Sequence, residues 1–234
     1  MKYIKIIVLG ENKKIDKDTL KFLPGSNDKI DISIANVKEN DEINFIDLFH
    51  RYNHVLDKTD FVCVVPSHSI FTQSYIDIIE EYIIDKDSIY LPLVLLQTKE
   101  ATGILNSSLW NSQLPEYGKL DHETALFQLD TTLYGAIIPV SYFKDESNYK
   151  KDLELYQHFY FLNKVTEEKD VVGIPKILLT IDKDMSYSNY TKEIKVEQFN
   201  KAREDWKEEK SVENKLFQKA QEEKDSHTSN LKIV

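Results

Sequence analysis

Short, continuously apolar runs alternate along this chain with segments that are apolar on one face only. Buried parallel strands are apolar on both faces, whereas the helices that cover a sheet are apolar on one. The alternation therefore predicts an α/β fold with a mostly parallel central sheet flanked by helices. We expect strands at 4–9, 30–37, 61–65, 89–96, 133–143 and 171–179, and helices at 15–23, 43–56, 74–84 and 153–165.

The clearest strand signal is the apolar run Phe61–Val65, which is followed directly by Pro66. A proline has no backbone N–H to donate, so Pro66 marks the carboxyl end of a central strand. Ligands of open α/β sheets bind beyond such carboxyl ends, and the residues after Pro66 are candidates for a site. Cys63, the single cysteine, is interpreted as a small core residue, and it excludes an intrachain disulfide or a multi-cysteine zinc site.

Length and charge limit the number of domains and the classes of binding partner. The 234 residues are 41% hydrophobic, which suits one core domain, expected at 1–192, with a charged helical tail at 193–234. The net charge of −10 disfavours nonspecific binding to nucleic acid or anionic membranes. Because no apolar stretch approaches the roughly 20 residues of a membrane span, we expect a cytoplasmic protein. The bias toward Lys, Asn and Ile is typical of an AT-rich genome, such as that of a virus.

Two segments fall outside the alternation. Residues 97–130 have little periodicity and several turn formers, and we interpret them as an excursion at one rim of the sheet. In 196–225 acidic and basic residues are interleaved with sparse apolar ones, which indicates a solvated helix or a helix that packs on a protein partner.

The glycine-rich loops of dehydrogenases and kinases and the HExxH motif of zinc proteases do not occur.

Several segments follow one another as they do in a known family. Leu9-Gly10-Glu11-Asn12 follows the first strand, a helix ending in His50-Arg51-Tyr52-Asn53 precedes the central strand, and Leu133–Pro139 is rich in small residues. Over residues 3–192 this order resembles the GT-A fold of family-2-type glycosyltransferases, which transfer a sugar from a nucleotide diphosphate to an acceptor hydroxyl. The resemblance implies a transferase of the hexosyltransferase type whose substrate is a nucleotide sugar.

The resemblance also implies site residues. Asp152, with Glu154 as second choice, stands where the family has the carboxylate that removes the acceptor proton; alternatively Asp152 only favours the amino end of a helix. Gly135 would let the backbone approach a ligand closely. The implied donor-binding residues are Asn12, Asn36, Ser67, His68, Gly135, Ser186 and Tyr187.

The chain departs from the family at its metal motif. The family ends the central strand in Asp-x-Asp, which holds Mn²⁺ or Mg²⁺ against the diphosphate, whereas this chain has Pro66-Ser67-His68-Ser69. Such a metal needs anionic oxygen ligands, which this segment lacks. His68 could be a single nitrogen ligand, could hydrogen-bond a phosphate, or could be a loop residue without a role. Two hypotheses remain open: an active transferase, and an inactive GT-A-fold protein with a structural or assembly role.

Overall fold

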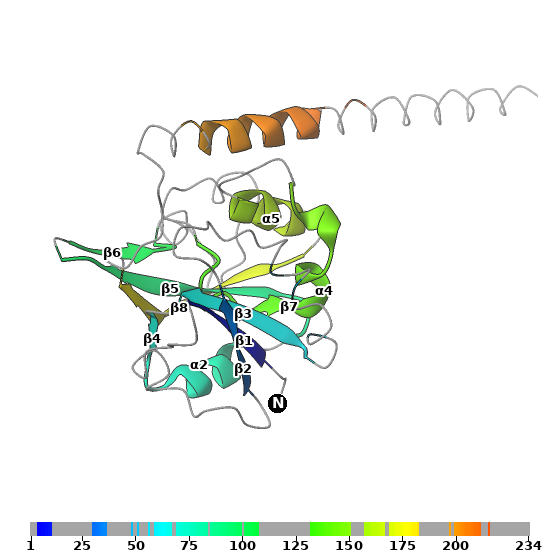
Figure 1. The fold of residues 1–234 in the computed structure, drawn as a ribbon. Helices are drawn as coiled ribbons and strands as arrows, with labels where there is room; N and C mark the ends of the chain where they lie inside the picture. Colours follow the sequence, from blue (N-terminus) through cyan, green and yellow to red (C-terminus); the bar gives the residue numbers. More distant parts are fainter. Residues whose placement is uncertain are drawn as a thin grey trace, which may run out of the picture. The chain divides into compact units, whose positions relative to one another are not determined.

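The chain divides into two compact units, Met1–Tyr190 and Thr191–Val234, which are described separately. Figure 1 shows the computed structural model. The predicted helices at 15–23 and 43–56 lie outside the described residues, apart from Leu48, Arg51 and Leu56. The structure describes residues 4–10, 30–36, 48, 51, 56, 59–66, 69–83, 85–99, 101–107, 132–150, 157–166, 169–182, 197, 199–211 and 215.

The first sheet has four strands in the order β2-β1-β3-β7. Strand β1 (Ile4–Gly10) is central and pairs in parallel with β2 (Ile30–Asn36) and with β3 (Phe61–Pro66). The short β7 (Ile138–Pro139) runs antiparallel to β3. All of β3 is buried, as its continuous apolar run predicts.

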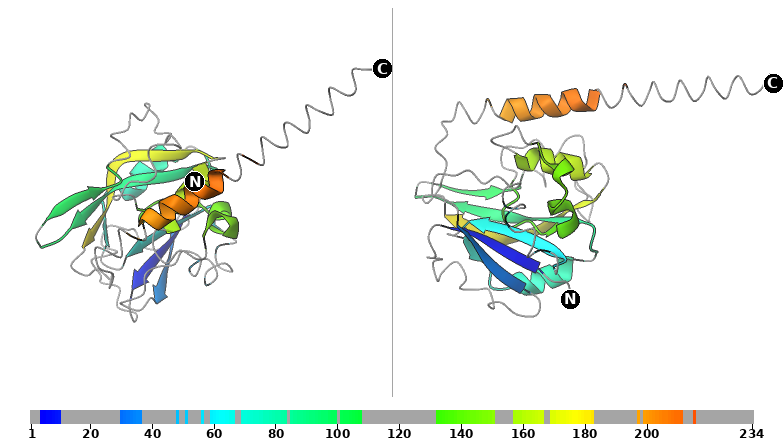
Figure 2. Two further views of the ribbon diagram at one scale, coloured as in Figure 1. Left: turned by 90° about the horizontal axis from the view of Figure 1, so that it is seen from above. Right: turned by 45° about the vertical axis from the view of Figure 1, so that its right-hand side comes forward.

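The second sheet has the order β4-β8-β5-β6. Its long strands β5 (Ile89–Gln97) and β8 (Val171–Asp182) are parallel to each other. The edge strands β4 (Ser69–Phe71) and β6 (Thr102–Leu105) are antiparallel to their neighbours. Strands β5 and β6 form a hairpin that extends away from the rest of the first unit (Figure 2).

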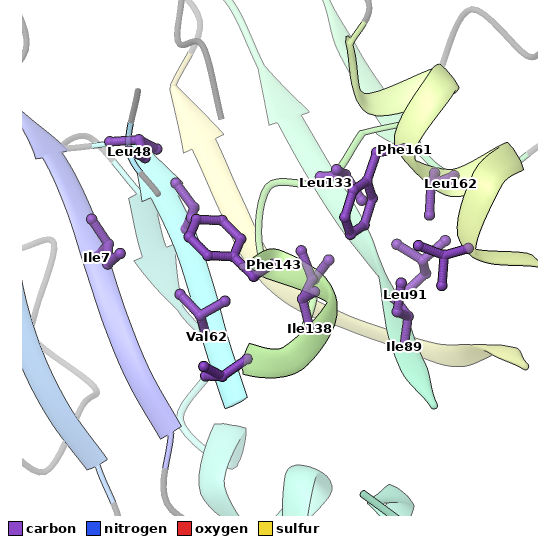
Figure 3. Close-up of a cluster of buried hydrophobic side chains, with 14 of the residues drawn as sticks. Ile7, Leu48, Val62, Ile89, Leu91, Leu133, Ile138, Phe143, Phe161 and Leu162 are labelled. Atoms are coloured by element: carbon purple, nitrogen blue, oxygen red, sulfur yellow. The ribbon is translucent and has the colours of Figure 1, made fainter. Parts of the chain in front are cut away.

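Helices cover both faces of the first sheet. On one face α5 (Gln157–Thr166) contributes to a buried cluster with Ile7, Val62 and Leu91, which is drawn in Figure 3. On the other face α2 (Tyr75–Tyr82) packs through Tyr75 and Ile79 in a cluster with Cys63 and Val65. Successive residues of β1 and β3 therefore alternate between the two clusters, as the side chains of a strand must.

One predicted strand is wrong. Of the segment 133–143, only β7 is a strand; Val140–Phe143 forms the short helix α4, and the 3₁₀ helix η2 (Glu146–Asn148) follows. Gly135 has φ +76°, and Ala136 N–H donates to Leu133 O, so the chain turns before β7. After Pro139, the Val140 N–H donates to Asp60 O at 3.0 Å and the chain leaves the sheet. An apolar run alone did not reveal these two turns.

The predicted fold class is confirmed: the first unit is a mixed α/β structure with parallel central pairings, and the second contains a helix over residues 199–211. In that helix Lys210 Nζ lies 5.1 Å from the centre of the Trp206 ring, one turn away. The prediction that Cys63 is a core residue is also confirmed. Within the described residues, no helix is long and apolar enough to cross a membrane.

Candidate functional site

The parallel strands end at one edge of the structure. In the first sheet Gly10 is level with Asn36, and Leu9 is level with Pro66. In the second sheet Gln97 is level with Asp182. Since β3 and β5 both run antiparallel to the chain around Ile137, all five parallel strands point in one direction. We call the ends of β1, β2 and β3 the carboxyl edge.

The strand order places a topological switch at this edge. The chain passes from β1 to β2 on one side of β1 and then to β3 on the other side. The connections that leave the carboxyl ends of β1 and β3 thus diverge, and this divergence is the feature of open α/β sheets where ligands bind. The candidate site therefore begins at Gly10 and Pro66.

The predicted site residues are only partly described. Asn36 is the last residue of β2, beside Gly10. Gly135 lies next to β3, because its N–H donates to Val64 O at 2.9 Å. The structure does not bring these two residues together in any contact that it describes. Asn12, Ser67, His68, Asp152, Glu154, Ser186 and Tyr187 lie outside the described residues.

Gly135 has a packing role that the sequence did not indicate. A Cβ atom built at this glycine would lie 3.3 Å from Leu179 Cδ2 and 3.7 Å from Pro92 Cγ. Its φ of +76° is in the left-handed region, which other residues rarely adopt. The close approach that Gly135 permits in this structure is to side chains of β8 and β5. A donor-binding role for Gly135 stays a prediction.

Sequence reasoning missed Asn106, which joins both ends of the 107–131 segment. This residue is fully buried and has φ +64°, a conformation that asparagine tolerates better than most residues. Its Nδ2 donates to Pro92 O at 2.9 Å, and its Oδ1 accepts from Thr132 N–H at 2.7 Å. The chain that leaves β6 is thereby fastened to the chain that returns at Thr132. The only signal in the sequence was an asparagine among turn formers.

No group of three His, Cys, Asp or Glu side chains in the described part of the chain could hold a metal ion. Ser69, which follows His68, is buried, and its Oγ has no hydrogen-bond partner in the structure described. Desolvation raises the pKa of Cys63 to about 12, so this thiol is not a nucleophile near neutral pH.

Asp85 lies at the opposite edge, just before β5. Its Oδ1 accepts from the N–H groups of Asp87 and Ser88 at 2.7 and 2.8 Å, and its Oδ2 accepts from Ser88 Oγ at 2.9 Å. Partial burial acts to raise the pKa of Asp85, but these hydrogen bonds together hold it below the usual value. Asp85 therefore caps a turn, and its position is remote from the candidate site.

Comparison with known proteins gives resemblances of structure alone. No family model and no curated protein sequence matches the chain. Among solved structures, S. aureus TarS 1-349 has a TM-score of 0.48 and 12% identity, and the match covers 77% of this chain and 60% of that one. TarS 1-349 was also solved in complex with UDP-GlcNAc. This chain thus spans less than two thirds of the TarS fragment.

Two other solved structures are similar to the chain. A197 from STIV has a TM-score of 0.46 and 9% identity, covering 74% of this chain and 82% of that one. The inositol-1-phosphate CTP transferase from T. maritima has a TM-score of 0.44 and 13% identity, covering 86% and 96%. At such scores these likenesses concern the path of the chain and say nothing about activity.

Proposed function

We propose that the chain binds a nucleotide-diphosphate sugar beyond the carboxyl ends of β1 and β3 and transfers the sugar to an acceptor hydroxyl. One observation carries the proposal: Gly10, Asn36 and Pro66 end neighbouring parallel strands at a topological switch. The predicted donor-binding residues Asn12, Asn36, Ser67 and His68 are at these ends or follow them by at most two residues. Residues predicted to share one role thus stand in the sequence at or just after the ends of three strands.

The direction of α5 supports Asp152 as the general base. Lys169 N–H donates to Val165 O, and Ile89 N–H donates to Asp170 O, so α5 ends near the start of β5. Phe161, nearer the amino end of α5, belongs to the same buried cluster as Leu133 (Figure 3). Ten helical residues span about 15 Å. Since the carboxyl end of α5 lies near the start of β5, its amino end lies away from that start, and Asp152 and Glu154 precede it in the sequence.

The residues after β3 do not fit a divalent metal clamp. Pro66-Ser67-His68-Ser69 offers hydroxyls and one imidazole, but no carboxylate, and a metal that bridges phosphates prefers anionic oxygen. We therefore propose that His68 donates a hydrogen bond to the diphosphate directly. On this proposal Asp152 accepts the proton of the acceptor hydroxyl, whose oxygen attacks the anomeric carbon while the nucleoside diphosphate leaves.

Calorimetric titration of the full chain with a panel of nucleotide sugars tests the proposal. We expect binding that persists when a chelator replaces manganese, and that weakens in His68→Ala. Asp152→Asn should keep donor affinity but lower the transfer rate by about 10²- to 10⁴-fold. Asp87→Asn is the matched control, because Asp87 adjoins the Asp85 turn at the opposite edge. If no member of the panel binds, the proposal is wrong.

A second function is favoured by the missing metal motif. A GT-A-fold protein that has lost catalysis would need neither Asp-x-Asp nor a donor, and 196–225 could then serve as an assembly surface. Titration separates the two functions, since this alternative predicts that no nucleotide sugar binds. The unmodified chain would then have no transferase activity, so Asp152→Asn would have none to lose. A change in oligomeric mass after deletion of residues 196–234 would support it.

A further inference from the structure

The exposed large hydrophobic side chains among the described residues all belong to the second sheet. Ile70 on β4, Ile177 on β8 and Ile104 on β6 are 41%, 39% and 42% exposed. Exposed apolar residues that are scattered singly over a surface need no explanation, but residues gathered on one face do. The strand registers show whether these three residues are gathered in this way.

The registers place the three isoleucines in two adjacent rows of one face. The first row crosses all four strands and consists of Ile70, Thr180, Leu95 and Ile104. In the second row Leu93 is level with Ile177. Residues that are level on neighbouring strands point to the same side of a sheet. We call these two rows the aliphatic face.

The aliphatic face extends beyond the part of the sheet that α5 covers. Side chains alternate along β5, so Ile89, Leu91, Leu93 and Leu95 point to one side. Ile89 and Leu91 are buried in the cluster to which α5 contributes. Leu93 and Leu95 belong to neither of the two buried clusters and are partly exposed. None of the described helices therefore covers this face.

A row of polar side chains borders the aliphatic face at the carboxyl ends of β5 and β8. Asp182 is level with Gln97, and Gln97 is level with Thr102 of β6. All three residues are exposed, and Gln97 is two residues after Leu95, so this polar row is on the same side of the sheet. Neighbouring side chains of such a row are about 5 Å apart. A carboxylate, an amide and a hydroxyl can therefore contact one head group together.

The polar row adjoins the candidate site. Only two residues separate β4 from the end of β3 at Pro66, and three residues of chain span at most about 11 Å. Ser69, the first residue of β4, is level with Ile181, and Asp182 is the next residue of β8. A molecule with its head at the polar row would thus lie beside the segment at which we propose that the diphosphate binds.

The size of the aliphatic face suits a small molecule. The four residues from Leu93 to Gln97 rise by about 13 Å, and four neighbouring strands span about 14 Å, which together enclose about 200 Å². A stable protein interface buries about 800 Å² on each partner. The face is therefore too small for a second copy or another protein, but large enough for a single short hydrocarbon chain.

The chemistry of the rows identifies the kind of molecule. The two apolar rows contain aliphatic and no aromatic side chains, so they suit a hydrocarbon chain. The Asp182 carboxylate and the net charge of −10 repel an anionic head group, whereas a carboxylate accepts hydrogen bonds from neutral hydroxyls. The rows together suit a molecule with a neutral hydroxylated head and a hydrocarbon chain.

We propose that this surface binds the acceptor of the sugar, an amphiphile whose hydroxylated head lies at the polar row and whose chain runs along Leu95 and Leu93. The inference rests on the proposed function and names the class of its acceptor. It adds no step to the transfer: the acceptor hydroxyl still loses its proton to Asp152, and its oxygen replaces the nucleoside diphosphate at the anomeric carbon.

The first experiment is calorimetric titration of the full chain with methyl, hexyl and octyl glucoside, below the concentrations at which they form micelles. Burial of one CH₂ group gives about a fourfold gain in affinity, and less where the chain is covered on one side. We therefore expect the affinity to rise about two- to fourfold for each added CH₂. Octyl phosphate should bind more weakly than octyl glucoside. An affinity that does not depend on chain length would overturn the proposal.

The second experiment locates the bound molecule with two variants of β6. Ile104→Ser should weaken the binding of octyl glucoside about three- to tenfold, because it removes apolar contact from the aliphatic face. Gly103→Ser is the matched control: Gly103 is level with Leu96, on the other side of the sheet, and a Cβ there meets no atom within 4 Å. Equal affinities of the two variants would contradict the proposed location.

Ultracentrifugation and donor titration distinguish the remaining outcomes. A dimer that octyl glucoside dissociates would show that a second copy occupies the face, and would overturn the proposal. If a nucleotide sugar binds but no alkyl glucoside does, the acceptor inference is wrong and the proposed function stands. If octyl glucoside binds as expected but no nucleotide sugar does, the proposed function is wrong and the acceptor role is lost with it.

Discussion

Tyr90 and Ile137 exchange two backbone hydrogen bonds, with N···O distances of 3.0 and 2.9 Å, and so join the two sheets of the first unit. Tyr90 belongs to β5 and Ile137 immediately precedes β7. Both side chains are fully buried in one cluster with Cys63 and Val94. The two sheets therefore share this buried cluster, although their strand ladders are separate.

This junction predicts a pattern of hydrogen exchange. The amides of Tyr90 and Ile137 should exchange as slowly as those in the middle of β3, because opening the junction requires opening the shared core. Native-state exchange measured by NMR checks this expectation. Exchange at Tyr90 and Ile137 that is much faster than at Val62 and Val64 would mean that the two sheets open independently.

Substitution of Gly135 should be costly. We expect Gly135→Ala to lower the free energy of unfolding by about 1–2 kcal/mol for the left-handed backbone, and further because its Cβ would crowd Leu179. Urea denaturation measures the change. Gly103→Ala is the matched control: its Cβ meets no atom within 4 Å, so we expect little loss or a small gain. Equal losses at both positions would contradict the packing argument.

Removal of the Asn106 side chain should also destabilise the fold. Asn106→Ala leaves Thr132 N–H and Pro92 O buried without their partner, and we expect a loss of about 2–5 kcal/mol in urea denaturation. Asn106→Gly makes the same deletion but relaxes the left-handed backbone, so it should be about 1 kcal/mol more stable than the alanine variant. Alanine and glycine variants of wild-type stability would show that the two hydrogen bonds contribute nothing.

Burial of Cys63 makes the free energy of unfolding depend on pH in the alkaline range. Its pKa is 9.0 in an ordinary setting and about 12 in the fold because of burial, although the hydrogen bond from Tyr75 acts to lower it. A raised pKa stabilises the fold fully below pH 9, and this contribution is lost as the pH rises toward 12. The slope is about 1.4 kcal/mol per pH unit for one group.

Denaturation at several pH values checks this expectation, with Cys63→Ala as the comparison. The variant should show a shallower decline above pH 9, while the burial-raised pKa of Tyr75 leaves part of the slope in place. Thiol reagents should modify the native protein only after unfolding. Rapid modification of Cys63 in the native chain at neutral pH would contradict its burial.

The sequence predicts an element correctly where the spacing of its apolar residues matches the faces that are buried in the structure. Strand β3 could be recognised because Phe61–Val65 is buried on both faces, and α2 because Tyr75 and Ile79 recur at helical spacing. Strands β4 and β6 could not, since strands of three and four residues are too short to leave an apolar run. The segment 133–143 was misread because its turns depend on backbone conformation at Gly135 and on the hydrogen bond to Asp60.

The sequence predicts a site after the ends of three strands, and the structure describes those strand ends. The carboxyl edge follows from strand order alone, and Asn36 lies on it. The role of Asn106 could not be foreseen, because its two partners are 14 and 26 residues away and only tertiary structure brings them together. For the same reason the sequence could not show that Gly135 packs against Leu179.

The Asn106 bridge has a consequence for how this protein can diversify. One side chain fastens the point where the chain leaves β6 to the point where it returns at Thr132, so the two ends of this connection are held together by a hydrogen bond. Lengthening a closed loop costs little, about 0.6 kcal/mol for each doubling. Changes in the number of residues between Asn106 and Thr132 should therefore alter the free energy of unfolding only slightly.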